Sequence, residues 1–247
     1  MRRFVILSGP SCVGKGPLYS ALRKFYPNLA GRLQQVVLYN SRDPRPGELE
    51  GVDYYFRHRA EIEDLARKPG FTSAIVRGDL QAIEIASIQK ILDQDKDAFF
   101  EGNPFIPAKL SESDELLGIP TLKVFLSPLS QEEILFLTDP SQRANLEKLL
   151  PEVMRRKLLR RTKRQKINLS LEDLENIEKR VASAIVELRE AWKFDYVIPN
   201  HDGEDSEHWD AFYYPIGDAR KTLLAFAALL QGETPPGVEH WEKGLVP

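Results

Sequence analysis

The chain begins with an apolar run, Phe4 to Leu7, followed by a glycine-rich loop and an amphipathic stretch, Leu18 to Phe25. The loop reads Gly-Pro-Ser-Cys-Val-Gly-Lys, and a strand, this loop and a helix are the context that the G-x-x-x-x-G-K pattern requires. Backbone N–H groups of such a loop point at a bound anion, and Lys15 adds an ammonium group for the outer phosphates. A turn with a chance lysine is the alternative, but spacing and context agree. We therefore predict a nucleoside triphosphate site.

The residues after Lys15 depart from the usual motif. Ser or Thr normally follows and ligates Mg²⁺, whereas this chain has Gly16 and then Pro17. Gly16 has no side chain to ligate an ion, and Pro17 has no N–H for a phosphate. We expect no protein metal ligand, Mg²⁺ held through water, and weakened or altered catalysis. The residues predicted to contact the nucleotide are Gly9, Ser11, Cys12, Val13, Gly14, Lys15 and Gly16.

A second motif, SRDPRPGELEGVDYYF, occupies residues 41–56. Arg42 and Arg45, stiffened by Pro44 and Pro46, form a fork suited to a dianionic phosphate. Tyr54 adds a hydroxyl donor. The alternative is a solvated proline-rich loop with incidental charges, which the upstream phosphate loop makes less attractive.

This second motif resembles the acceptor-site segment of guanylate kinases, whose form is T-R-x-P-R-x-G-E-x-x-G-x-x-Y-x-F. The resemblance extends loosely over residues 3 to 200. It implies an α/β P-loop kinase fold with a mostly parallel sheet, a small acceptor-binding subdomain and a basic helical lid. It also implies that ATP is the donor and that Arg42, Arg45 and Tyr54 hold the phosphate of the acceptor.

The residues that read guanine in that family are altered here. Ser73 stands for a glutamate, and Asn103 replaces an aspartate while Glu101 is kept. The stretch Gly78 to Ala82 lacks a tyrosine, and Leu38 replaces a serine. A carboxylate accepts two N–H bonds from the guanine edge, which serine or asparagine cannot reproduce with the same charge. The predicted acceptor-binding residues are Arg42, Arg45, Tyr54, Ser73, Glu101 and Asn103, without assumed guanine specificity.

The most basic stretch is Met154 to Lys166, with eight basic residues in thirteen. Nucleic-acid binding is one interpretation, weakened by the lack of interleaved aromatics, and a solvated helix face is another. The resemblance implies a lid that closes over the triphosphate, with a further arginine matched by Arg180. The choice among Arg160, Arg161 and Arg164 stays open. The residues we predict to be catalytic are Lys15, Arg160, Arg164 and Arg180.

The region after the last predicted strand departs from the family. Asn200 matches an asparagine that lies near adenine in the family. Residues 201–218 combine acidic residues, His208 and aromatics, and we interpret them as a surface loop pinned by aromatics rather than a metal site. Residues 233–247 form a predicted extended tail. Trp241 docks on a neighbouring surface or on a partner subunit, which leaves a homodimer open.

Short apolar runs alternate with helical patterns, which favours a parallel sheet with helices on both faces. The predicted strands are Phe4 to Ser8, Gln35 to Tyr39, Thr72 to Val76, Ala98 to Glu101, Leu122 to Leu126 and Tyr196 to Pro199. The predicted helices are Leu18 to Tyr26, Arg59 to Arg67, Gln81 to Gln94, Gln131 to Thr138, Ala144 to Gln165, broken or kinked at Pro151, Ser170 to Lys193 and Ala219 to Gln231. We place a guanylate-kinase-like domain at 1–200, with the acceptor part near 34–82 and the lid near 140–175, and an insertion, helix and tail at 201–247.

Composition restricts the partners. The 247 residues carry a net charge of −3, so nothing in the overall charge attracts nucleic acid. The longest apolar runs, such as Leu223 to Leu230, are too short to cross a bilayer. The single Cys12 excludes an intrachain disulfide framework, and the N-terminus lacks a signal-peptide pattern, so we expect a cytoplasmic protein.

Two functions follow as hypotheses. The first is an enzyme that moves the γ-phosphoryl of ATP to a phosphorylated acceptor, such as GMP, a related nucleotide or a sugar phosphate. The second is a weakened binding module, like the scaffold domains of the family, that holds a phosphorylated partner or nucleotide. Lys15 and the lid arginines favour the enzyme. Gly16, Pro17, Leu38 and Ser73 favour the binding module.

Overall fold

The structure, a computed structural model, describes residues 2–45, 47–111 and 116–247. Its chain divides into two compact units. Unit 1 comprises Met1–Ile6 and Arg32–Leu122, and unit 2 comprises Leu7–Gly31 and Lys123–Pro247. The predicted nucleotide loop and lid therefore belong to unit 2, and the predicted acceptor residues belong to unit 1. Pro46 of the arginine fork lies outside the described residues.

The larger sheet has the strand order β2-β7-β1-β8-β9 among the described residues. These strands are β1 (Phe4–Ser8), β2 (Leu33–Gln35), β7 (Asp97–Gly102), β8 (Thr121–Ser127) and β9 (Tyr196–Pro199). β2 pairs with β7 and β8 pairs with β9, both in parallel. Every residue of β1 is buried, as expected for the middle of a sheet whose two faces are covered. The predicted α/β fold with a mostly parallel sheet is confirmed.

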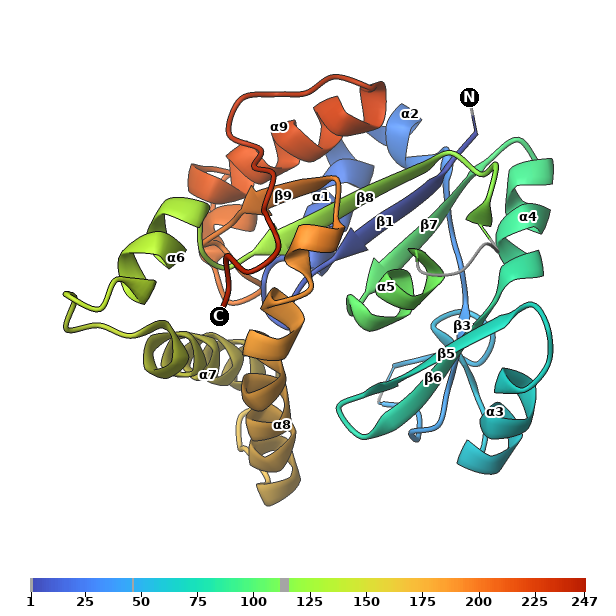
Figure 1. Cartoon of the computed structure of the whole chain (residues 1–247), viewed down its shortest axis with the longest axis horizontal. Coiled ribbons are helices and arrows are strands. Elements are labelled where there is room, and N and C mark those ends of the chain that lie inside the picture. Colours follow the sequence, from blue (N-terminus) through green and yellow to red (C-terminus); the bar gives the residue numbers. More distant parts are fainter. Residues whose placement is uncertain (1, 46, 112–115) are drawn as a thin grey trace. The chain divides into compact units, whose positions relative to one another are not determined.

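A second sheet, within unit 1, has the order β4-β3-β6-β5. Its strands are β3 (Leu38–Asn40), β4 (Tyr54–Phe56), β5 (Phe71–Val76) and β6 (Asp79–Glu84). β5 and β6 form an antiparallel hairpin closed by Arg77 and Gly78 (Figure 1). Ile62 of helix α3 (Arg59–Ala66) packs with Leu80 and Ala82 in a buried cluster. This sheet carries the predicted acceptor motif.

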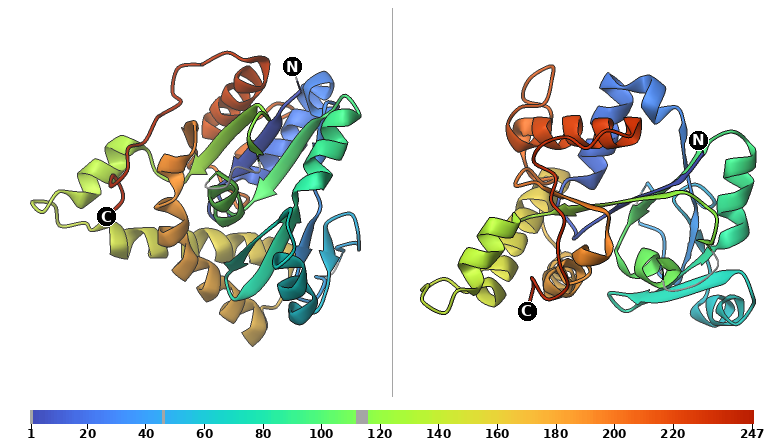
Figure 2. Two further views of the ribbon diagram at one scale, coloured as in Figure 1. Left: turned by 45° about the vertical axis from the view of Figure 1, so that its right-hand side comes forward. Right: turned by 45° about the horizontal axis from the view of Figure 1, so that its top comes forward.

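The helices of unit 1 are α3 (Arg59–Ala66), α4 (Ile85–Asp93) and α5 (Phe105–Ser111). Those of unit 2 are α1 (Lys15–Phe25), α2 (Pro27–Ala30), α6 (Gln131–Thr138), α7 (Leu146–Gln165), α8 (Leu171–Leu188) and α9 (Gly217–Gln231). α7 and α8 follow each other along the chain and pack together as a helical hairpin, and Figures 1 and 2 show them as neighbours. This hairpin contains most of the predicted lid.

Some of the predicted elements were wrong. The predicted strand at Gln35 to Tyr39 is two strands in two different sheets, because β2 ends at Gln35 and β3 begins at Leu38. The first residues of the predicted helix Gln81 to Gln94 belong to β6, whose pairing with both β5 and β3 outweighs their helical pattern. α7 continues through Pro151, which removes a single N–H near the start of the helix. Among the described helices, none is both long enough and apolar enough to cross a membrane.

Candidate nucleotide site and candidate acceptor site

The loop after β1 has the backbone conformation of an anion-binding turn. Gly9 and Gly14 have φ angles of 142° and 104°, which side chains other than glycine rarely tolerate. A Cβ on Gly9 would lie 2.3 Å from the carbonyl oxygen of Leu126. α1 begins at Lys15, so the loop N–H groups gather at the N-terminus of a helix. Pro17 lies in the first turn of α1, where proline is well tolerated.

Lys15 is hydrogen-bonded to the main chain of this loop, whereas Cys12 is a buried neutral side chain within it. The Lys15 side chain is buried, and its Nζ donates to the carbonyl oxygens of Gly9 at 2.8 Å and Pro10 at 2.7 Å. The ammonium group is therefore held beside the loop. Burial raises the pKa of the Cys12 thiol to about 12, so it stays neutral at physiological pH. This agrees with a small residue that fills the loop.

Asn200 joins the end of β9 to the loop. Its side chain is fully buried, and its Nδ2 donates to the carbonyl oxygens of Val13 at 2.8 Å and Asp202 at 2.7 Å. Its Oδ1 accepts the Asp202 N–H. Both amide hydrogens are thus used within the protein. The structure places Asn200 as a brace of the loop, and its predicted place near adenine stays a prediction.

The lid arginines lie in two settings. Arg180 of α8 donates from Nη1 to the Ser11 hydroxyl of the loop at 3.3 Å. Arg160 of α7 is largely exposed and pairs with Asp205 at 3.8 Å, and Arg164 pairs with Glu207 at 3.1 Å. The structure thus joins Arg180 to the loop and joins the other two to the segment after β9.

Two further α7 cations, one helical turn apart, act electrostatically on the loop. Lys157 and Arg161 are among the charges that lower the pKa of the Cys12 thiol against the dominant effect of burial. The Nε of Arg161 is buried and has no hydrogen-bond partner among the described residues. The choice among Arg160, Arg161 and Arg164 was open from the sequence, and Arg161 is the one of the three whose charge acts on Cys12 of the loop.

Residues 202–207 lie against the loop, which the sequence did not reveal. The Gly14 N–H donates to the Glu204 carboxylate at 3.0 Å. Trp209 donates from its indole to the carbonyl oxygens of Asp202 and Gly203, so an aromatic does pin the segment. We predicted that residues 201–218 form a surface loop. That prediction is wrong for Asp202 and Asp205, whose side chains are buried. Among the described residues, no cluster of three or more His, Cys, Asp or Glu side chains is suited to a metal ion.

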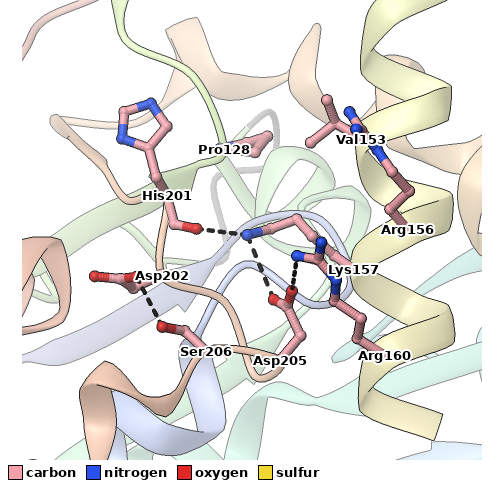
Figure 3. A pocket seen from close by; sticks show the side chains of 9 residues that line it. All are labelled: Pro128, Val153, Arg156, Lys157, Arg160, His201, Asp202, Asp205 and Ser206. Carbon is pink, nitrogen blue, oxygen red and sulfur yellow. Dashed lines mark hydrogen bonds and ion pairs between the residues drawn. The ribbon is translucent and has the colours of Figure 1, made fainter. Parts of the chain in front are cut away.

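A cavity of about 340 Å³ lies beside this segment in unit 2. Figure 3 shows Asp205 between the ammonium of Lys157 and the guanidinium of Arg160, at 3.4 and 3.8 Å. Lys157 also donates to the carbonyl oxygen of His201 at 2.5 Å. The basic lid helix is thereby tied to the acidic segment.

In unit 1, Arg45 and Tyr54 lie beside the ion pair of Arg42 and Glu48, and we call this group the clamp. The Arg42 guanidinium donates to both oxygens of Glu48 at 2.6 Å and lies over the rings of Tyr54 and Phe56, with its Cζ 5.2 and 5.6 Å from their centroids. Glu48 also accepts the backbone N–H of Arg45 at 2.7 Å. Burial tends to raise the pKa of Glu48, but the bonds to Arg42 and Arg45 lower it overall. The guanidinium of Arg42 and the main-chain N–H of Arg45 therefore meet at the Glu48 carboxylate.

Arg77 is a residue that the sequence analysis missed at this clamp. It closes the β5–β6 hairpin with a φ of 56°, which is unfavourable for a large side chain. Main-chain and hydroxyl bonds between Ser41 and Leu80 dock this turn beside Arg42. Burial raises the pKa of Tyr54, and the charges of Arg42, Arg45 and Arg77 oppose that rise. The sequence signal that could have pointed to Arg77 is an arginine directly before Gly78, in the two-residue turn of a hairpin.

Two of the residues expected to read a base, Asn103 and Ser73, are hydrogen-bonded to other residues of unit 1. Asn103 donates to the Gln81 side chain at 2.9 Å, and its Oδ1 accepts the N–H groups of Phe105 and Ile106 at the start of α5. The carbonyl oxygen of Ser73 accepts from the Lys109 ammonium at 2.7 Å. Glu101 lies half-buried near the end of β7. Amides and a lysine thus occupy this end of the candidate acceptor site.

The fold and the P-loop define an α/β protein of the P-loop kinase class. The chain belongs to the guanylate kinase family, because the family model described as "Guanylate kinase" matches residues 1–157. A guanylate kinase of Synechococcus is 30% identical over 86% of this chain and 82% of its own length. One from Thermus thermophilus is 30% identical over 80% of this chain and 74% of its own. A crystal structure of guanylate kinase from Anaplasma phagocytophilum matches with a TM-score of 0.54 and 19% identity over 94% of this chain and 85% of that chain, which supports the fold.

Proposed function

We propose that the protein is a guanylate-kinase-like phosphotransferase that moves the γ-phosphoryl of ATP to a phosphorylated acceptor, GMP or a related nucleotide. The observation that carries this proposal is the bidentate grip of Arg42 on a carboxylate, with Tyr54 beneath it. An arginine whose guanidinium lies over a ring, with both terminal nitrogens donating to one oxyanion, has the geometry to bind a phosphate in place of Glu48.

On the donor side, the P-loop offers main-chain N–H groups, and Lys15 offers a charge for the transferring phosphoryl. Phosphoryl transfer needs alignment and charge neutralisation more than covalent chemistry. Arg180 at Ser11 and Arg161 of α7 are suited to neutralise developing charge. Arg160 and Arg164 remain candidates for that role if their carboxylate partners give way.

Mg²⁺, which the family uses with ATP, fits this site only through the phosphates and water. Position 16 has no side-chain oxygen, and a Cβ there would meet nothing within 4 Å. The space for a ligating hydroxyl exists, but the hydroxyl is missing. When bound, the ion would neutralise charge on the transferred phosphates. We therefore expect that the affinity for Mg²⁺ depends only weakly on the side chains of the protein.

The acceptor side supports a relaxed choice of base. Asn103 uses its amide for Gln81 and for the first turn of α5, so it is not available to pair with a guanine edge without rearrangement. Lys109 at Ser73 adds positive charge where the family has a glutamate. We infer that discrimination between GMP and other phosphorylated acceptors is small, and a sugar phosphate is included among them.

A binding module is the second candidate, and one observation favours it. The P-loop amide of Gly14 is already bonded to a carboxylate of the protein. A domain that binds phosphorylated partners without phosphoryl transfer needs only the clamp of unit 1. An assay of ADP formation with ATP, Mg²⁺ and a panel of GMP, AMP, UMP, CMP and ribose phosphates separates the two. Binding of an acceptor without ADP formation above background selects the module.

The phosphate clamp is tested by Arg42→Ala combined with Arg45→Ala. We expect acceptor affinity to fall by about 100-fold or more, because two charge-assisted contacts to a dianion are lost. ATP affinity should change by less than about two-fold. Isothermal titration calorimetry with each ligand measures both. Arg67→Ala, an exposed arginine of unit 1 that pairs with Asp64, is the matched control. An equal loss of ATP and acceptor affinity would show that the clamp is misplaced.

A further inference from the structure

The segment from Asp202 to Glu207 is seated on the P-loop in unit 2. Glu204 accepts the Gly14 N–H at 3.0 Å. A Cβ on Gly203 would lie 2.0 Å from the carbonyl oxygen of Cys12, and one on Gly14 would lie 2.9 Å from that of Asp202. The two backbones therefore run against each other with no side chain between them. This closeness requires glycine at positions 14 and 203.

The same segment binds cations of the lid helix. Asp205, only 6% exposed, lies between Lys157 and Arg160, and Glu207 pairs with Arg164 (Figure 3 shows the Asp205 contacts). Three carboxylates within four residues thus engage a P-loop amide and three cations of α7. A bound triphosphate presents oxyanions to the same kinds of group.

We propose that residues 202–207 are an internal occupant of the donor phosphate site, with the Glu204 carboxylate on the amide that a phosphate oxygen of ATP would take. This inference rests on the proposed function, since it assumes that the P-loop receives ATP. One N–H cannot serve two anions at full strength, so nucleotide binding requires Glu204 to leave. The apparent ATP affinity falls by the fraction of molecules in which Glu204 has left. The insertion is therefore an autoinhibitory element.

The segment keeps its own support when Glu204 is changed. The Asp202 carboxylate bonds to Ser206 Oγ at 2.8 Å, to His208 Nδ1 at 2.9 Å and to the Ala219 N–H at 3.0 Å. Trp209 holds its main chain. Removing the Glu204 side chain therefore frees the Gly14 N–H without unfastening the loop.

The test measures ATP and inorganic pyrophosphate affinity of the full chain by calorimetry, with Mg²⁺ present. We expect Glu204→Ala to bind both about ten-fold more tightly, because a charge-assisted bond is lost from the competing state. Glu204→Gln, which keeps an oxygen acceptor and loses the charge, should fall between wild type and Glu204→Ala. Asp210→Asn is the matched control, since it neutralises an exposed carboxylate of the same insertion and should stay within two-fold of wild type.

Each other result overturns a different statement. If wild type and Glu204→Ala bind ATP equally well, the internal occupant is refuted while the proposed kinase function stands. If Glu204→Ala binds more weakly, Glu204 assists the nucleotide and the autoinhibitory role is refuted. If all variants keep the wild-type melting temperature and none binds ATP or pyrophosphate, the proposed function and this inference both fail.

Discussion

Gly16 occupies the first turn of α1, where the Mg²⁺-ligating hydroxyl of a P-loop usually lies. A Cβ at this position meets nothing within 4 Å, and its φ is not in the left-handed region. A serine therefore fits without strain. The Mg²⁺ ligand is missing here because glycine has no hydroxyl group, and not because a side chain would clash.

We predict that Gly16→Ser lowers the Mg²⁺ concentration needed for half-maximal ATP turnover several-fold, because a protein oxygen then joins the coordination of the ion. A Mg²⁺ titration of ADP formation at fixed ATP measures this. Gly16→Ala is the control, since it stabilises the helix in the same way but adds no hydroxyl. Identical midpoints for the serine and alanine variants would refute the role of ligation.

Arg77 combines an unfavourable backbone conformation with a place beside the clamp. Asparagine tolerates left-handed φ better than arginine and is favoured in two-residue hairpin turns. Arg77→Asn should therefore raise the free energy of unfolding by up to about 1 kcal/mol and weaken acceptor binding by about ten-fold. Urea denaturation and calorimetry check the two halves. If the variant binds the acceptor as tightly as wild type, Arg77 has no role in acceptor binding.

At the scale of elements, the C-terminal tail covers the outer edge of β9. Val197 and Glu239 exchange both main-chain hydrogen bonds at 2.8 Å. Trp241 is only 6% exposed, and its indole N–H donates to the Glu239 carboxylate. A sheet edge left open invites pairing with other chains, and this tail occupies the edge at Val197. The sequence left open whether Trp241 docks on its own chain or on a partner subunit. The structure shows it buried within its own chain, so a homodimer is not needed to bury it.

Trp241→Ala should destabilise the protein by about 3–5 kcal/mol, because a large buried side chain is removed and the tail loses its anchor. Chemical denaturation followed by circular dichroism measures the loss. Phe212→Ala, at a 65% exposed aromatic of the same unit, is the matched control and should change stability by less than about 0.5 kcal/mol. Similar losses in the two variants would contradict the anchoring role.

At the scale of the whole molecule, stability against pH depends on His201, which links three elements. Its Nδ1 lies 2.6 Å from Asp218 of α9, and its Nε2 lies 3.0 Å from Glu133 of α6. Burial alone would lower the pKa of His201, but these two carboxylates raise it above its ordinary value. Protonated His201 therefore stabilises the folded chain.

Because the folded pKa is raised, this stabilisation is complete below the unfolded pKa of about 6.5 and is lost as pH rises through the folded pKa. The denaturation midpoint of wild type should fall between pH 6 and pH 8.5. In His201→Gln that fall should be smaller, since the titrating group is gone. Parallel slopes in the two proteins would show that other groups set the pH dependence.

Most of the sheet was predictable from the sequence. β1 and β9 match their predicted bounds, because short apolar runs between turn residues are a local signal. The P-loop and the arginine fork were identified for the same reason, since their chemistry resides in consecutive residues. The boundary between β2 and β3 was not predictable from the sequence. The two strands differ in the distant strands with which they pair, since β2 pairs with β7 and β3 pairs with β6.

The sequence by itself determined the family, and it located the phosphate loop and the predicted clamp residues Arg42, Arg45 and Tyr54, because these signals lie in the order of neighbouring side chains. Only the tertiary structure decided what those groups contact. The bond from Gly14 to Glu204 spans 190 positions, and that from Asn103 to Gln81 spans 22. Such contacts have no periodicity along the chain, since they arise when packing brings separate elements together.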